Sequence, residues 1–136
     1  MASFSLKSET HPTQSEIGKL YAYISDFKNF RSILPEDKVV DFVSEGDSCS
    51  FTIKGVTKLS VRIAEKTENK RIKFQTEGLA KFNFVLYANF EGEVNSAGKC
   101  SVDMEGDLNP FILQMAKKPL EQLVNTMSEK LSQLSV

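Results

Sequence analysis

Residues 82–134 decide the fold, and they read FNFVLYANFEGEVNSAGKCSVDMEGDLNPFILQMAKKPLEQLVNTMSEKLSQL. In residues 82–90, apolar and polar side chains alternate with a period of two, which predicts a strand with one buried face. Asn95-Ser96-Ala97-Gly98 is typical of a hairpin turn, and a second alternating run follows it as far as Leu108. The two runs therefore predict a pair of antiparallel strands.

After Asn109 and Pro110 the period changes, which predicts a long helix up to residue 134. Pro119 lies inside this segment, where it removes one backbone hydrogen bond and is expected to kink the helix. One broad apolar stripe is expected to face the sheet. It consists of Phe111, Ile112, Met115, Leu120, Leu123, Val124, Met127, Leu131 and Leu134.

Upstream of residue 82 the period of two continues back to about residue 38. Four further strands are expected there, and with the pair above they make six consecutive strands joined by short turns, an antiparallel meander. Residues 2–10 alternate in the same way and predict a first strand that joins the edge of the meander. One face of this sheet is apolar, and the final helix is expected to cover it.

Residues 13–34 are expected to form helices between the first strand and the meander. Thr13 followed by Glu16 fits a capping box for a helix over residues 17–24. A second cap at Ser25 or Asp26 would open a short helix, which Pro35 ends. His11, just before the first cap, is expected in a solvated loop.

The order of elements resembles the START-like superfamily, also called SRPBCC, which includes polyketide cyclases and plant pathogenesis-related allergens. The likeness is carried by residues 21–30 (YAYISDFKNF), 33–35 (ILP), 109–113 (NPFIL) and the run from 117–120 (KKPL) to Leu134. It implies an α+β helix-grip fold: an antiparallel seven-stranded sheet bent around a long C-terminal helix, with two short helices between strands 1 and 2. It covers nearly the whole of a single domain, residues 1–136.

The resemblance also implies an apolar cavity between sheet and helix, in which many members bind lipids, sterols or aromatic products. Binding of a small hydrophobic or amphipathic molecule is therefore the first functional hypothesis. The phenylalanines of the inner face could instead fill the space and leave a closed core. Candidate cavity-lining residues are Phe51, Ile53, Val61, Phe74, Thr76, Phe84, Leu86, Val102, Met104, Met115, Leu123, Met127 and Tyr21.

Two alternatives remain open. A cyclase- or hydratase-like enzyme would need polar handles, and Tyr21, Tyr23 and Thr76 are the candidates. Some cyclase relatives use an inward carboxylate or histidine, but no His or Asp of this chain falls on the inner parity, so no catalytic residue is assigned. The third hypothesis is an accessory protein-interaction domain, for which a filled interior and an exposed apolar patch would argue.

Composition bounds the remaining classes. With 17 basic and 18 acidic residues the formal net charge is −1, so there is no overall basic field to hold nucleic acid or anionic lipid. The apolar runs are too short to span a membrane, and a cytoplasmic protein is expected. Cys49 and Cys100 are expected to be reduced core thiols, and with a single histidine we expect neither a metal nor another cofactor. Val85 and Tyr87, on the outer face, hint at a homodimer.

Overall fold

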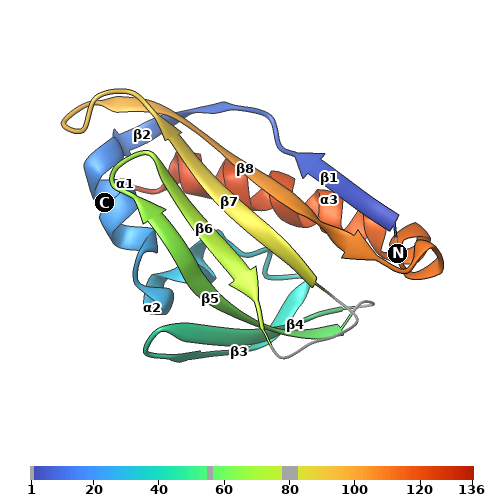
Figure 1. The fold of residues 1–136 in the computed structure, drawn as a ribbon. Coiled ribbons are helices and arrows are strands. Elements are labelled where there is room, and N and C mark those ends of the chain that lie inside the picture. Colours follow the sequence, from blue (N-terminus) through green and yellow to red (C-terminus); the bar gives the residue numbers. More distant parts are fainter. Residues whose placement is uncertain (1, 55–56, 78–82) are drawn as a thin grey trace.

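An antiparallel sheet of eight strands forms the body of the computed structural model, which describes residues 2–54, 57–77 and 83–136. Seven strands follow one another in the order β1-β8-β7-β6-β5-β4-β3, and β2 also pairs with β8. Figure 1 shows the long helix α3 behind β8 and β1, with α1 and α2 toward the end of the sheet away from the N-terminus. The helix-grip architecture expected from the sequence is thus confirmed.

The elements have the following bounds: β1 Ala2–Lys7, β2 His11–Glu16, α1 Ile17–Ile24, α2 Phe27–Phe30, the 3-10 helix η1 Arg31–Ile33, β3 Val39–Glu45, β4 Ser48–Ile53, β5 Thr57–Thr67, β6 Arg71–Thr76, β7 Asn83–Glu91, β8 Ala97–Leu108 and α3 Pro110–Gln133. Phe82, expected at the start of β7, lies outside the described residues.

The inner face of the sheet follows the predicted alternation. Every second residue of β4, β6 and β7 is buried, and β8 is buried at Cys100, Val102, Met104 and Leu108. β1 and β8 stay in register from Ala2 opposite Leu108 to Lys7 opposite Asp103. The sheet therefore presents one continuous apolar surface to α3.

α3 begins where Asn109 caps it: the Asn109 side-chain oxygen accepts a hydrogen bond of 2.9 Å from the Phe111 N–H. Its 24 residues span about 36 Å, enough to cross the sheet. It continues through Pro119 and packs on β8, β2, β1 and η1. Its buried residues are Ala116, Leu120, Leu123, Val124, Met127, Ser128, Leu131 and Ser132.

The apolar stripe of α3 is narrower than the sequence suggested. Phe111 and Met115 were expected to face the sheet, but they are 70% and 64% exposed, so that expectation is wrong. Successive helical residues are about 100° apart, and a stripe through Leu120, Leu123 and Met127 leaves Phe111 and Met115 on the opposite side. Ile112 and Leu113, beside them, are partly buried against the core.

The capping box predicted at Thr13 and Glu16 is also wrong, because these residues belong to strand β2. The Glu16 side chain makes no capping hydrogen bond at the start of α1. The Thr13 hydroxyl instead accepts from the Gly98 N–H at 2.8 Å and donates to the Ser15 carbonyl at 3.0 Å. His11, expected in a solvated loop, lies half-buried in β2 opposite Cys100.

β2 brings the strand count to eight and places the short helices between β2 and β3. The second predicted cap holds: the Asp26 carboxylate accepts from the Lys28 N–H at 2.9 Å at the start of α2. Leu34 is extended just before Pro35, as expected of a residue that precedes proline.

Candidate ligand-binding site

The fold brings most of the predicted lining residues together between the sheet and α3, and there they leave no free space. A water-sized hollow beside any of these side chains would leave part of its surface accessible. Yet each of the following is at most 1% exposed: Phe51, Ile53, Val61, Phe74, Leu86, Val102, Met104, Leu123 and Met127. Around these side chains the grip between sheet and helix is therefore filled.

Two phenylalanines of α2 contribute to this filling. The Phe27 ring lies 5.9 Å from the Phe74 ring, centroid to centroid, and the Phe30 ring lies 4.9 Å from it. Phe30 also reaches Phe51, at 6.4 Å. The short helix thus inserts two aromatic rings against the candidate lining residues, and sequence reasoning did not assign them that role.

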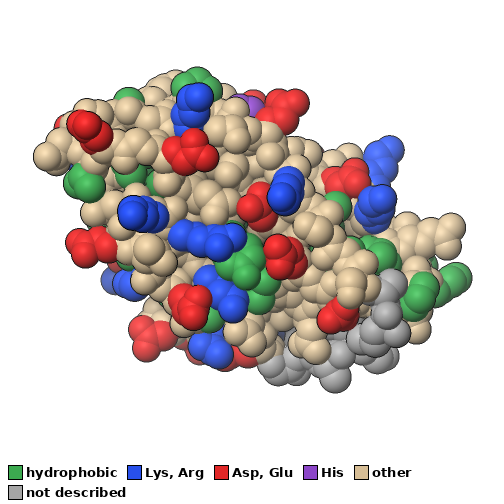
Figure 2. Space-filling model, turned by 45° about the horizontal axis from the view of Figure 1, so that its top comes forward, with side chains coloured by type: hydrophobic (Ala, Val, Ile, Leu, Met, Phe, Trp, Pro, Cys, Tyr) green, Lys and Arg blue, Asp and Glu red, His purple; other side chains and the backbone are tan. Residues whose placement is uncertain are grey.

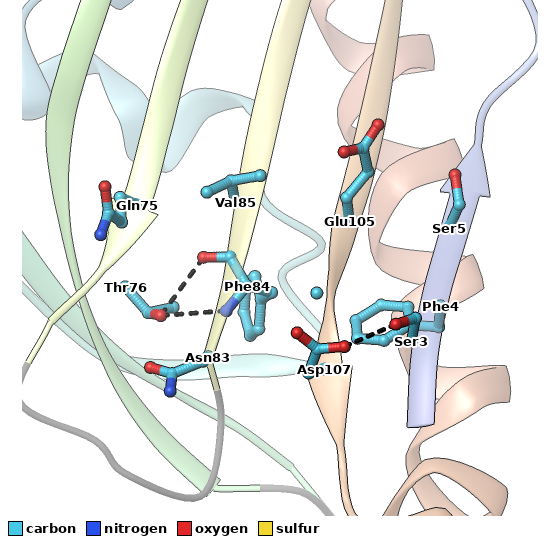
Figure 3. Close-up of a pocket in the computed structure, with 11 residues that line it drawn as sticks. Ser3, Phe4, Ser5, Gln75, Thr76, Asn83, Phe84, Val85, Glu105 and Asp107 are labelled. Atoms are coloured by element: carbon cyan, nitrogen blue, oxygen red, sulfur yellow. Dashed lines mark hydrogen bonds between the residues drawn. The ribbon is translucent and has the colours of Figure 1, made fainter. Parts of the chain in front are cut away.

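A recess of about 620 Å³ opens at one end of the sheet, across four neighbouring strands. It is the place where two of the predicted lining residues, Thr76 and Phe84, meet a larger free volume (Figure 3). The described residues that line it come from β1, β6, β7 and β8: Ser3, Phe4, Ser5, Gln75, Thr76, Asn83, Phe84, Val85, Glu105, Gly106 and Asp107.

Gly106 shapes the floor of this recess. It lies opposite Phe84 of β7 on one side and Phe4 of β1 on the other. A Cβ at Gly106 would come within 2.7 Å of the Phe84 Cβ, so β7 and β8 approach too closely there for a side chain. A glycine inside an alternating strand was the one sequence signal for such a close approach.

Two hydrogen-bonded pairs fix the walls of the recess. The Thr76 hydroxyl accepts from the Phe84 N–H and donates to the Phe84 carbonyl, both at 3.2 Å, which ties β6 to β7. The Ser3 hydroxyl donates to the Asp107 carboxylate at 2.7 Å and ties β1 to β8. Among the described lining residues the charges are the exposed carboxylates of Glu105 and Asp107, so the rim is polar and acidic.

Met115 and Tyr21 lie elsewhere. The solvent-facing position of Met115 contradicts its assignment to the inner face. Tyr21 lines a separate recess of about 660 Å³ between α1 and the turn after β5, and its ring meets the Phe90 ring edge-on with centroids 6.3 Å apart. Burial raises the pKa of the Tyr21 phenol, and the nearby Glu68 carboxylate adds to the rise.

The polar handles of the enzyme alternative are scattered. The Thr76 hydroxyl already donates one hydrogen bond to the Phe84 backbone and accepts another from it. The Tyr23 hydroxyl lies 3.1 Å from the Ser32 hydroxyl, away from both Thr76 and the recess around Tyr21. The described residues therefore do not gather Tyr21, Tyr23 and Thr76 into one site.

Cys49 and Cys100 are free, buried thiols, as expected. Burial raises the pKa of each thiol to about 12. The Cys100 thiol lies 3.7 Å from the Ser128 carbonyl of α3, so it contributes to the contact between sheet and helix.

On the outer face of the sheet, basic and acidic side chains are interspersed, as Figure 2 shows. The Arg71 guanidinium lies over the Tyr87 ring, 3.8 Å from its centroid. It thereby covers Tyr87, one of the two outer-face residues (Val85 and Tyr87) from which a homodimer was expected. Val85, the other member of that pair, lines the recess at the sheet end. In the described part of the chain, no helix is both long and apolar enough to cross a membrane.

Of the comparisons with known proteins, the one with solved structures bears on the fold. No family model matches the chain, and no curated protein matches it. Among solved structures it is similar to a norcoclaurine synthase point mutant from Thalictrum flavum in complex with a transition-state analogue, with a TM-score of 0.70, 10% identity, and coverage of 96% of this chain and 92% of that one.

Two bacterial structures are similar as well. A Thermus thermophilus protein aligns with a TM-score of 0.66 and 12% identity over 95% of this chain and 94% of that one. A START superfamily protein from Mycobacterium smegmatis aligns with a TM-score of 0.62 and 12% identity over 96% and 94%. At these identities the likeness establishes the fold: the chain has the START-like, SRPBCC-type helix-grip fold.

Proposed function

We propose that the chain binds a small amphipathic molecule at the recess formed by the ends of β1, β8, β7 and β6. One observation carries the proposal: Thr76 and Phe84, which belong to the inner face of the grip, also line a recess of about 620 Å³. That volume lies within the range of about 300 to 1,000 Å³ that is usual for small-molecule sites.

The lining favours a ligand with an apolar part and a polar part. Phe4 and Val85 are partly exposed and offer apolar surface next to the bare backbone of Gly106, and the almost fully buried Phe84 adds to the lining. Serine, glutamine and asparagine side chains lie beside them and offer both donors and acceptors. An aromatic or aliphatic group on the floor and a hydroxyl or amide at the rim would satisfy both parts of the recess.

The charge of the rim narrows the choice further. Glu105 and Asp107 line the recess, and the other described residues that line it carry no charge. Two carboxylates at one site repel an anionic group and attract a cationic one. We therefore propose a ligand whose polar end is neutral or cationic.

The filled interior limits how deep such a ligand can reach. The predicted lining residues beneath α3, such as Phe74, Leu86 and Met104, are at most 1% exposed, so a molecule lying there would have to displace them. Moving well-packed side chains costs free energy, whereas the recess is already open. The proposal therefore places the ligand at the end of the sheet, where outer-face residues such as Val85 and Glu105 line the recess.

The test is a fluorescence titration with N-phenyl-1-naphthylamine, a neutral apolar probe, excited above the absorption of protein aromatics. Phe84→Trp enlarges a ring that lines the recess and should weaken probe binding about tenfold, because the larger ring takes part of the volume that the probe would occupy. Phe90→Trp is the matched control: Phe84 and Phe90 lie on the inner face of the same strand, and each is 4% exposed.

The expected result is weaker binding in folded Phe84→Trp and wild-type affinity in Phe90→Trp. Unchanged affinity in a folded Phe84→Trp protein would sink the placement. Anilinonaphthalene sulfonate, which adds an anionic sulfonate to the same ring system, should bind more weakly than the neutral probe, because Glu105 and Asp107 repel it.

A second candidate function is favoured by the filled interior itself. An accessory interaction domain needs a stable packed core rather than a ligand cavity, and the inner face has that character. Failure of the wild-type protein to bind the neutral probe would favour this second function over the first.

A further inference from the structure

The two most exposed large apolar side chains of the described residues lie together at the start of α3. Phe111 is 70% exposed and Met115 is 64% exposed. They are four residues apart, which puts them on neighbouring turns of the same helix face. The other exposed large apolar residues are smaller: Val43 lies on β3, Val94 between β7 and β8, and Val136 after α3.

Basic side chains accompany this apolar pair. Lys118 lies seven residues after Phe111 and therefore on the same exposed face, and Lys117 lies beside it. Both lysines are exposed. Residues 110–120 contain no Asp or Glu, and the first carboxylate along the helix is that of Glu121. The first turns of α3 thus carry a local charge of +2, although the whole chain has a net charge of −1.

The exposed pair is too small to hold a protein partner alone. A large aromatic side chain buries at most about 250 Å², and Met115 adds no more than that. A standard protein interface needs about 800 Å² from each partner. A second copy of the chain, which would present the same two lysines, would also bring like charges together.

We propose that the exposed face of the first turns of α3, formed by Phe111, Met115, Lys117 and Lys118, docks on the surface of an anionic lipid bilayer. Phe111 and Met115 insert their side chains at the boundary between headgroups and acyl chains, and the lysines meet the lipid phosphates. This inference is argued from the exposed residues of α3 and does not depend on the ligand proposed above.

The location of the docking face gives it a use. α3 begins two residues after the end of β8, and residues 105–107 near that end line the recess. The docking face and the recess therefore lie at the same end of the molecule (Figure 1). Asp107 is held by Ser3 on β1. A docked protein would therefore hold its recess near the bilayer.

Vesicle sedimentation tests the inference, with large vesicles of phosphatidylcholine alone and of phosphatidylcholine with one quarter phosphatidylglycerol. The wild-type protein should sediment with the anionic vesicles, and less so at high salt. Phe111→Ser/Met115→Ser should weaken the partitioning at least about tenfold. Lys117→Gln/Lys118→Gln should weaken binding to anionic vesicles by about fivefold per lysine.

A tryptophan reporter shows which surface meets the lipid, because the chain has no Trp. The fluorescence of Phe111→Trp should shift to the blue on adding anionic vesicles. Val43→Trp, at a 49% exposed position on β3, is the control and should not shift. Affinity for the neutral probe should stay unchanged in all these variants, since none of their positions lines the recess, which separates this test from that of the proposed function.

Three results would overturn the inference. The wild-type protein could fail to sediment with anionic vesicles, or both double variants could sediment as the wild type does. In the third case, sedimentation equilibrium would show a dimer that Phe111→Ser/Met115→Ser dissociates, and a second copy of the chain would be the occupant of this face.

Discussion

The two thiols show how a single buried group couples to the stability of the protein. Cys49 lies opposite Val61 in the pairing of β4 with β5, and Cys100 lies against α3 near the Ser128 carbonyl. Both are almost fully buried. An apolar environment disfavours the thiolate, which is why burial raises the pKa of each thiol from 9.0 to about 12.

This shift predicts a loss of stability at alkaline pH. Below pH 9 the thiols are protonated in both the folded and the unfolded chain, so their contribution is fully present. Between about pH 9 and 12 the unfolded chain loses protons that the folded chain keeps, and the free energy of unfolding falls by about 1.4 kcal/mol per pH unit for each thiol. Urea unfolding under reducing conditions at pH 8 and pH 10.5 measures it.

Cys49→Ala should remove one thiol's share of the alkaline loss, roughly 2 kcal/mol between those two pH values, and Cys100→Ala should do the same. Ser50→Ala, next to Cys49 on β4, is the control. Its free energy of unfolding should fall between pH 8 and pH 10.5 by as much as that of the wild type. If Cys49→Ala and the wild type lose the same stability, the thiol titrates in the folded state as it does in the unfolded one.

At the scale of residues, sequence reasoning predicted which strand residues face inward, but it did not predict how the side chains fill the interior. The alternation in β6 and β7 placed Thr76, Phe84 and Leu86 on the inner face, and there they are. It could not predict that the Phe27 and Phe30 rings would pack against Phe74 and close the grip, because filling depends on side chains from another element and on their rotamers.

At the scale of elements, β2 shows how one local pattern can serve two structures. A threonine three residues before a glutamate can cap a helix, but the same hydroxyl can also serve a neighbouring strand. Thr13 accepts from the Gly98 N–H of β8, and Ser15 donates to the Leu134 carbonyl at 2.6 Å. These partners are 85 and 119 residues away, so a local sequence window holds no signal for them.

The Thr13 hydroxyl is expected to stabilise the junction of β2 and β8. Thr13→Val keeps the shape of the side chain but leaves the Gly98 N–H without its hydroxyl acceptor, and this should cost about 1 to 3 kcal/mol of stability in urea unfolding. Thr10→Val makes the same change at an exposed position before β2 and should cost much less. Equal losses in the two variants would contradict a role for the Thr13 hydroxyl.

α3 shows what a helical period leaves open. The period predicted a helix, and one of 24 residues is present, with Asn109 as its cap. Over residues 110–115, however, two apolar residues face solvent and two are partly buried, so an apolar side chain did not identify the inward side. That distinction depends on how far the sheet extends under the first turn of the helix, which is a property of the whole fold.

At the scale of the whole molecule, a filled grip and an open end of the sheet make different predictions for where a ligand binds. Backbone hydrogen–deuterium exchange with and without N-phenyl-1-naphthylamine distinguishes them. Binding at the recess should slow exchange at residues 3–5, 83–85 and 105–107, because the ligand would hold β1, β7 and β8 together there. Exchange along residues 120–131 of α3 should not change, since their inward side chains already pack without free space.

The same exchange experiment on Phe84→Trp provides the control, because a ligand excluded from the recess gives no protection at these strand ends. Slower exchange along residues 120–131 of the wild-type protein would contradict the placement, since only a ligand under the helix would stabilise α3 over that length. In that case side chains such as Leu123 and Met127 would have to move from the positions in which they are now 1% exposed. The filled grip would then be the unliganded state of a cavity that opens on binding.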